Sequence, residues 1–383
     1  MRFKIVFLFI TLIPIFFYLG KGDVDDNEIS NKLINCVDNN TVNHVRCARN
    51  VMKTSLSIKN IKDIVDTISN ENKDNIKFNN LCHDIAHIIG EEAYVQHKDR
   101  ALIKNLESCG EGFIHGVMSK FQSSESGVLK LIRYCEDLPN NTDLNFVKDF
   151  SSNLYFNCYH GLGHSHGAGY IIDEENVDFI KRDFISNNYK FCQNIFNIVE
   201  KKYNKANDDI ISYCFYGGYS EFIVKFYKYK ELNNKSYNSF FPNSEFTDCN
   251  FIPNSKSLIY CYEISTIMSL NLIKKNFINL SESAKARSND KLVTNVNNFC
   301  RLLNFKDYSI GCLEGLSSYY IKELFSNKYS LDNLVNDPKN INIYLNNACS
   351  FDIEDRCRDR FLYDLKIKVD KSFYEELVSI IDS

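Results

Sequence analysis

Fourteen cysteines recur along this 383-residue chain in a regular pattern, which constrains the fold more than any other feature. In sequence order they form neighbouring couples. The second member of each later couple recurs in steps of 45 to 56 residues, at positions 109, 158, 214, 261, 312 and 357. Self-similarity at such a period is the signature of a repeat architecture, so we expect units of about fifty residues.

The even cysteine count, together with an export signal, indicates disulfide bonds, because thiols pair in oxidising compartments. Sequence alone leaves the connectivity open. The simplest scheme joins sequence neighbours and predicts Cys36–Cys47, Cys82–Cys109, Cys135–Cys158, Cys192–Cys214, Cys249–Cys261, Cys300–Cys312 and Cys349–Cys357.

Apolar residues recur at helical spacing after the repeat cysteines, as in Phe215, Tyr219, Phe222 and Phe226. Segments before the first cysteine of a couple show the same spacing, and strand-like runs bounded by turns are scarce. We therefore predict an all-α fold of disulfide-stapled helical hairpins, each cysteine bridge fixing the start of a second helix. One hairpin cannot bury its apolar face alone, so the hairpins must stack into a closed toroid or an open solenoid.

Glycine stands three residues after the repeat cysteine in four of the six units, at Gly112, Gly161, Gly217 and Gly315. One interpretation is that helices crowd together there and leave no room for a side chain. The other is an ordinary glycine between a loop and a helix.

The N-terminus carries Arg2 and Lys4, an apolar stretch over 5–19 and then acidic residues from Asp23. This pattern predicts a signal peptide or membrane anchor over residues 1–22, and both alternatives stay open. Either way the positive-inside rule places residues 21–383 outside the cytoplasm, secreted or anchored. We expect residues 23–383 to form a single helical-repeat domain with a histidine-rich part over 80–170.

The net charge of −4 gives no electrostatic footprint for nucleic acid. We therefore expect no nucleic-acid partner, and membrane contact only through the N-terminal segment. An unidentified small molecule or protein remains as the partner class.

Six of the eight histidines lie in three short blocks, over residues 82–90, 109–116 and 158–167, and each block also holds a cysteine and glycine. His83 and His87 are four residues apart, and so are His160 and His164. On a helix, the two side chains of each pair would therefore lie on the same face. His115 and His164 both stand six residues after a repeat cysteine, so stacking would make them neighbours. We predict that these five residues converge on a metal, with His166 behind them or on a second metal.

Imidazole ligands without a committed thiolate suit zinc, copper or iron, and zinc is the first choice. Glu111 is the favoured catalytic carboxylate because it occupies the repeat position of His160. Asp84, Glu91 and Glu92 are further candidates, although the last two fit a solvated helix face better. Tyr216 occupies the same repeat position as His160. We expect it either to line a cavity or to lie in the core with its hydroxyl hydrogen-bonded.

Three function classes follow. The first is a metal-dependent hydrolase or oxidoreductase, and the second is an extracytoplasmic metal-binding or delivery protein without turnover. The third is a protein-binding repeat scaffold with a structural metal. The coordination shell discriminates between them, because an open position favours chemistry and a saturated site favours structure or storage.

Overall fold

The computed structural model describes the chain over residues 26–38, 44–55, 61–68, 76–101, 112–120, 125–137, 154–170, 177–205, 207–233, 247–274, 279–303, 306–349, 356–369 and 371–383. These residues form helices and no strand, which confirms the predicted all-α class. Within the same residues, no helix combines the length and the apolar character that crossing a membrane requires. The expected signal or anchor over 1–22 lies outside the described residues.

The chain divides into two compact units, Met1–Phe113 and Ile114–Ser383. In the first unit the helices α2, α3 and α5 pack against one another. Its described elements are α2 (Asp26–Asp38), α3 (His44–Ser55), a helical stretch over 61–68, α5 (Ile76–His97) and the 3-10 helix η1 (Lys98–Ala101). The expectation of a single repeat domain over 23–383 stays a prediction.

The second unit begins within α6 (Gly112–Lys120). Its other α-helices are α7 (Glu125–Glu136), α8 (Leu154–Gly169), α9 (Val177–Tyr203), α10 (Asp209–Asn233), α11 (Ser255–Lys274), α12 (Glu282–Arg301), α13 (Lys306–Ser326), α14 (Lys328–Asn336), α15 (Ile341–Cys349), α16 (Arg356–Lys368) and α17 (Lys371–Ile381). The described part of this unit also contains the 3-10 helices η4 (Thr247–Phe251) and η6 (Pro338–Asn340).

Inner and outer helices of the second unit differ in how their residues are distributed. Most of α13 is buried, including Leu313, Leu316 and Leu324, as expected for a helix surrounded by others. By contrast α12 buries one stripe that includes Val293 and Val296, and its outward side is charged. The distribution of apolar residues therefore makes α12 a covering helix and α13 a central one.

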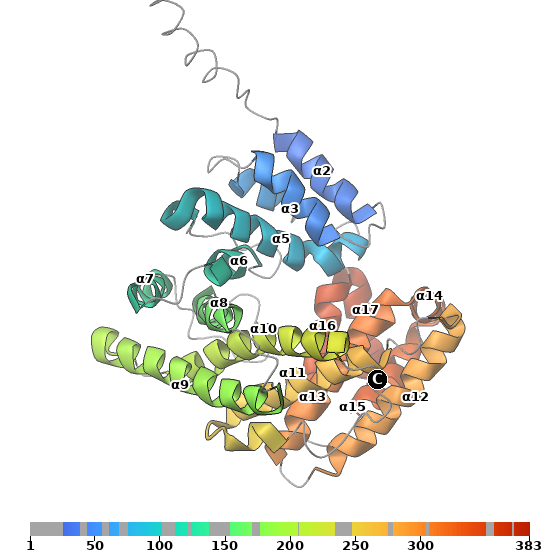
Figure 1. The fold of residues 1–383 in the computed structure, drawn as a ribbon. Helices are drawn as coiled ribbons and strands as arrows, with labels where there is room; N and C mark the ends of the chain where they lie inside the picture. The colour runs from blue at the N-terminus through green and yellow to red at the C-terminus, as the bar shows by residue number, and fades with distance from the viewer. Residues whose placement is uncertain are drawn as a thin grey trace, which may run out of the picture. The chain divides into compact units, whose positions relative to one another are not determined.

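The helices that contain the repeat cysteines pack in chain order, α8 on α10, α10 on α11, α11 on α13 and α13 on α16 (Figure 1). Others cover this series: α9 lies against α10, and α12 against α13 and α15. Side chains at equivalent positions of neighbouring cysteine-containing helices are thereby brought together.

Six predicted disulfide bonds are confirmed. They are Cys36–Cys47, Cys135–Cys158, Cys192–Cys214, Cys249–Cys261, Cys300–Cys312 and Cys349–Cys357, with Cα–Cα distances of 5.4 to 5.9 Å. Cys82 is also disulfide-bonded, and Cys109 lies outside the described residues. This pairing indicates an oxidising, extracytoplasmic environment.

The position of the cysteine within its helix differs from the prediction in most of the second unit. The helices α8, α10, α11 and α13 begin about one to two turns before their cysteine rather than at it. In α10 the reason is visible: Ile210 and Ile211, which precede Cys214, are buried and extend the apolar surface of the helix. Only α16 begins next to its cysteine, Cys357.

The repeated glycines mark close approaches between helices, as the crowding interpretation predicts. A Cβ atom on Gly217 would lie 1.9 Å from the carbonyl oxygen of His160, and one on Gly315 would lie 2.3 Å from that of Glu263. Neither oxygen can move without its helix. Residues 217 and 315 therefore let neighbouring backbones touch.

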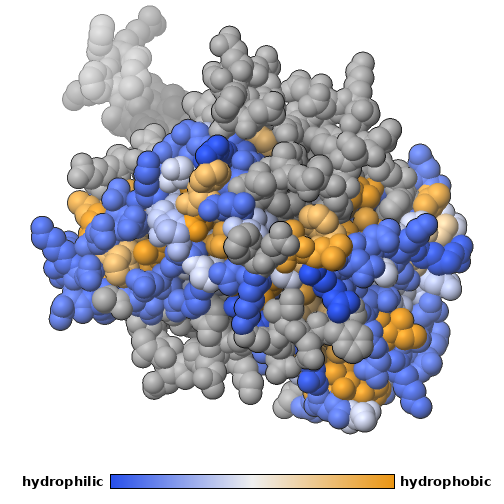
Figure 2. All heavy atoms as spheres, turned by 90° about the horizontal axis from the view of Figure 1, so that it is seen from below, coloured by the Kyte–Doolittle hydropathy of each residue, from blue (hydrophilic) through white to orange (hydrophobic). Residues whose placement is uncertain are grey.

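Hydrophilic side chains cover much of the face in Figure 2, and hydrophobic ones gather there in small patches. Large apolar side chains are exposed singly, for example Leu302 and Val335. Scattered exposed apolar residues are normal on a soluble surface, so they do not mark an interface by themselves.

Candidate metal centre

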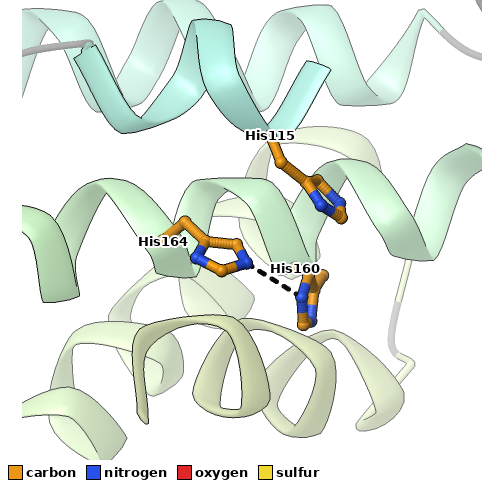
Figure 3. A group of neighbouring side chains, drawn as sticks. All are labelled: His115, His160 and His164. Atoms are coloured by element: carbon orange, nitrogen blue, oxygen red, sulfur yellow. Dashed lines mark hydrogen bonds between the residues drawn. The ribbon is translucent and has the colours of Figure 1, made fainter. Parts of the chain in front are cut away.

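Three of the predicted histidines, His115, His160 and His164, form one cluster in the second unit (Figure 3). One ring nitrogen from each lies within 4.8 Å of the others. The Nε2 atoms of His160 and His164 are 3.1 Å apart, and the ring of His115 lies 4.8 Å and 5.2 Å from theirs, centroid to centroid. His115 and His164 lie close together, as their shared position relative to a repeat cysteine predicts.

Local helical geometry brings these rings together. His160 and His164 are one turn apart on α8, so their side chains leave the same face of that helix. His115 reaches them from α6, at a place where Gly161 replaces a side chain. A Cβ atom there would lie 2.7 Å from Sδ of Met118 and 3.1 Å from the His115 ring. Gly161 thus makes space for the third imidazole.

The cluster is buried and has an orienting carboxylate. His115 and His160 are 4% and 7% exposed, and Nδ1 of His164 lies 3.4 Å from Oε2 of Glu221 on α10. A hydrogen bond from Nδ1 to this carboxylate would fix the tautomer of His164 and direct Nε2 toward the cluster. Histidine ligands of metals usually have such a partner.

The distances fit a small transition-metal ion. With Zn–N bonds of about 2.0–2.1 Å, tetrahedral ligand nitrogens lie roughly 3.4 Å apart. The pair of Nε2 atoms at 3.1 Å is already near this spacing, and the widest separation of 4.8 Å needs to shorten by a side-chain adjustment. The three histidines could therefore hold a metal ion, and nothing in the arrangement selects its identity.

His166 follows His164 by two residues and lies in a different environment. Its ring stacks on Phe191 at 4.2 Å and also contacts Phe184. Burial lowers the pKa of His166 to about 4, so this imidazole is neutral at physiological pH. The structure shows it as an aromatic packing residue outside the three-histidine cluster.

His83 and His87 belong to the first unit, on α5. Their rings are 6.4 Å apart, and Nδ1 of His87 lies 3.3 Å from Oε1 of Glu91. Arg49 binds Glu91 at 2.8 Å and Glu92 at 3.3 Å. Their convergence with the cluster stays a prediction.

The other predicted carboxylates have separate outcomes. Glu92 is buried against Arg49, so it is not a solvated face residue, whereas Asp84 is exposed. Glu111, the favoured catalytic carboxylate, lies outside the described residues.

A row of polar groups continues from the cluster through the neighbouring helices. The ring of Tyr216 lies 4.9 Å from that of His160 and 4.8 Å from that of Tyr260. Burial is the main cause that raises the pKa of Tyr216, so its hydroxyl stays protonated at neutral pH. Tyr216 therefore separates the histidines from the charged groups beyond it.

Those charged groups form a buried ion network between α11, α13 and α16. Arg360 lies 3.1 Å from Glu263, and Arg356 lies 2.8 Å from Glu314. Arg360 also binds Asp364 at 3.0 Å. Burial raises the pKa of Glu263 to about 7, against the lowering effect of Arg360, and burial likewise raises the pKa of Glu314.

Two features of this region were missed from the sequence. Glu221 is the single carboxylate between residues 210 and 230, a segment rich in apolar and aromatic residues, and that isolation is a signal that could have found it. Arg356 and Arg360 are one turn apart and flank Asp359. They read as a surface face, and only the packing of α16 on α13 shows that they meet Glu314 and Glu263.

Comparison with known proteins identifies no relative: no protein-family model, curated protein or solved structure matches the chain.

Proposed function

We propose that this chain is an extracytoplasmic metal-binding protein of the helical-repeat type, with its metal held by His115, His160 and His164. The observation that carries the proposal is the convergence of three buried imidazoles from two helices, with ring nitrogens within 4.8 Å. Buried imidazoles crowded this closely are costly unless a shared partner binds them. Zinc is the first choice, with copper and iron next.

The ligand set supports a hydrolase or oxidoreductase. A divalent ion with three protein ligands keeps a position for water or substrate and acts there as a Lewis acid. Glu221 would keep His164 in the ligating tautomer, and Tyr216 would present an aromatic wall beside His160. A substrate is not specified by these residues.

A second candidate is metal binding or delivery without turnover, and the burial of the cluster favours it. His115 and His160 are almost fully covered, so a substrate larger than a few atoms would need a conformational change to reach them. A metal tying α6 to α8 would also serve a protein-binding scaffold.

The overall architecture that we propose is a series of stacked helical hairpins. The chain-order packing of the cysteine-containing helices and the within-hairpin disulfides support it. Closed toroid and open solenoid are both compatible with these contacts.

The test is metal content of the exported, disulfide-bonded protein, measured by plasma mass spectrometry after gel filtration in metal-free buffer. We expect about one equivalent of transition metal. His164→Ala should lower it well below one equivalent. Glu221→Gln, which removes the carboxylate but keeps the shape, should weaken metal affinity roughly 10–100-fold.

His97→Ala is the matched control, because His97 lies on α5 and is not a predicted ligand. It should retain the wild-type metal content, and circular dichroism should show the same helix content in all variants. Full metal occupancy in both His164→Ala and His115→Ala would contradict the proposal. Equal loss in His97→Ala would show that the loss is not specific to the cluster.

A further inference from the structure

A cavity of about 170 Å³, partly open to solvent, lies in the second unit and shares no residue with the histidine cluster. It is formed by α11, α12, α13, α14 and α15 and is lined by Lys274, Glu282, Lys285, Asn289, Tyr320 and Glu323, with Tyr344 and small polar residues beside them. A cavity of about 150 Å³ accommodates one six-membered ring. The enclosed part therefore holds about six heavy atoms, and a larger ring molecule extends through the open side.

The charges on the cavity wall neutralise one another. Lys274 binds Glu323 at 2.5 Å, and Lys285 binds Glu282 at 2.9 Å. A ligand with a fixed charge would have to compete with one member of a pair and leave the other without its counter-ion. Glu323 is the one member of the two pairs with little exposure, at 8%, and an uncharged ligand leaves its pairing with Lys274 intact. The wall therefore favours a molecule without net charge.

The same wall offers both kinds of hydrogen-bonding group. Ammonium groups donate and carboxylates accept, while the amide of Asn289 can do both. An apolar ring would displace water from these groups without replacing its hydrogen bonds, which is unfavourable. Hydroxyl groups donate to Glu282 or Glu323 and accept from Lys285, so a ring carrying several hydroxyls satisfies the wall.

Two tyrosines complete the cavity. Tyr320 and Tyr344 meet edge to face with ring centroids 5.7 Å apart, and Tyr320 is held by hydrogen bonds to Asp290 and Asn347. Burial raises the pKa of Tyr344 to about 12, so its hydroxyl remains a donor at neutral pH. Aromatic carbon against one side and polar groups against the other is the environment that an amphipathic ring requires.

We propose that this cavity binds one uncharged monosaccharide, with the pyranose carbons against the tyrosines and the hydroxyl groups on the Lys285–Glu282 and Lys274–Glu323 pairs. A ligand of about a dozen heavy atoms is expected to bind with a dissociation constant on the order of 1 mM. Saturation-transfer NMR detects binding in this range.

The experiment uses the full-length disulfide-bonded protein with glucose, galactose, mannose and N-acetylglucosamine as separate probes. We expect saturation transfer to at least one sugar. Lys285→Met, which removes the ammonium but keeps the stem, should raise the dissociation constant of that sugar about tenfold. Glu282→Gln should also weaken binding, because the carboxylate acceptor is lost.

Lys291→Met is the matched control, because Lys291 is an exposed lysine of the same helix, α12, and does not line the cavity. It should bind the sugar as the wild-type protein does. Glycine, alanine and glutamate are probed in parallel. The proposal is overturned if no sugar shows transfer, if Lys285→Met and Glu282→Gln bind as the wild type does, or if only the amino acids bind.

Discussion

At the scale of single residues, the ion network of Glu263, Glu314, Arg356 and Arg360 places charged groups in the interior of the fold. Removing a charge from water costs several kcal/mol, and a partner recovers this only with good geometry. Glu263 is completely buried, and a nitrogen of Arg360 lies 3.1 Å from its carboxylate. Its raised pKa shows that the cost is only partly recovered.

Glu263 should therefore make the protein less stable as pH rises. Below about pH 4.5 the carboxyl is protonated in both states. Between there and its folded pKa of about 7, the folded protein keeps a proton that the unfolded chain releases, so rising pH favours unfolding. In this window we expect the free energy of unfolding of the wild type to fall relative to that of Glu263→Gln by up to about 1.4 kcal/mol per pH unit. Above the window, the two free energies should change with pH in the same way.

Chemical denaturation with intact disulfides at pH 4.5, 5.5, 6.5 and 7.5 measures this difference. The other ionisable groups are the same in both proteins, so their contributions cancel in the difference. The control is Glu200→Gln, at an exposed position of α9. If wild type and Glu263→Gln keep a constant difference across the window, Glu263 does not hold the proton.

The position of a side chain could be predicted where it follows from the sequence distance to a repeat cysteine. The approach of His115 to His164 follows from their shared distance to a cysteine. His166 does not follow, because two residues on a helix are about 200° apart, which turns its ring toward Phe191. Glu221 could not be paired with His164 from sequence, because the two lie on different helices whose register is set by packing.

At the scale of elements, the cysteine-containing helices are held by backbone contact as well as by apolar side chains. The α8–α10 contact is the closest: Gly163 faces the carbonyl oxygen of Cys214, and Gly217 faces that of His160. Helical periodicity predicted these helices because it is a local signal. Their starting points were missed by about one to two turns, since apolar residues before the cysteine extend each helix.

Gly217→Ala should force α8 and α10 apart, because the new methyl group would lie 1.9 Å from the carbonyl oxygen of His160. Overpacking of this kind lowers the free energy of unfolding by about 1–3 kcal/mol. We expect a value toward the upper end, because the clash is with a backbone atom that cannot rotate away. We also expect weaker metal binding, since the displaced segment carries His160.

Denaturation and metal titration of the same samples measure both effects. Val224→Ala, at an exposed position of α10, should change neither by more than about 0.5 kcal/mol. A Gly217→Ala protein with wild-type stability would contradict the close contact.

At the scale of the whole molecule, covalent closure is distributed along the chain rather than concentrated at one point. The described disulfides close segments of 11, 23, 22, 12, 12 and 8 residues. Their neighbour pairing could be predicted because it repeats. The choice between toroid and solenoid could not, because it depends on small rotations between hairpins that accumulate and leave no mark on any one unit.

Removing a bridge should cost stability according to the segment that it closes. Chain entropy predicts about 3 kcal/mol for the double variant Cys135→Ser/Cys158→Ser and about 2.5 kcal/mol for Cys349→Ser/Cys357→Ser. Urea denaturation measures both. Metal binding should weaken only in the first variant, because Cys158 lies two residues before His160. Equal loss of metal in both variants would contradict a local effect.

The shortness of these closed segments bears on how the protein is made. A bridge spanning 8 to 23 residues needs no distant part of the chain, so it can form as soon as its own hairpin emerges on the oxidising side. In the stack of hairpins that we propose, assembly can then proceed from the N-terminus in step with translocation, and each finished hairpin offers a packing surface to the next. In a chain of this kind the bridges nearer the N-terminus can close before α17 is synthesised.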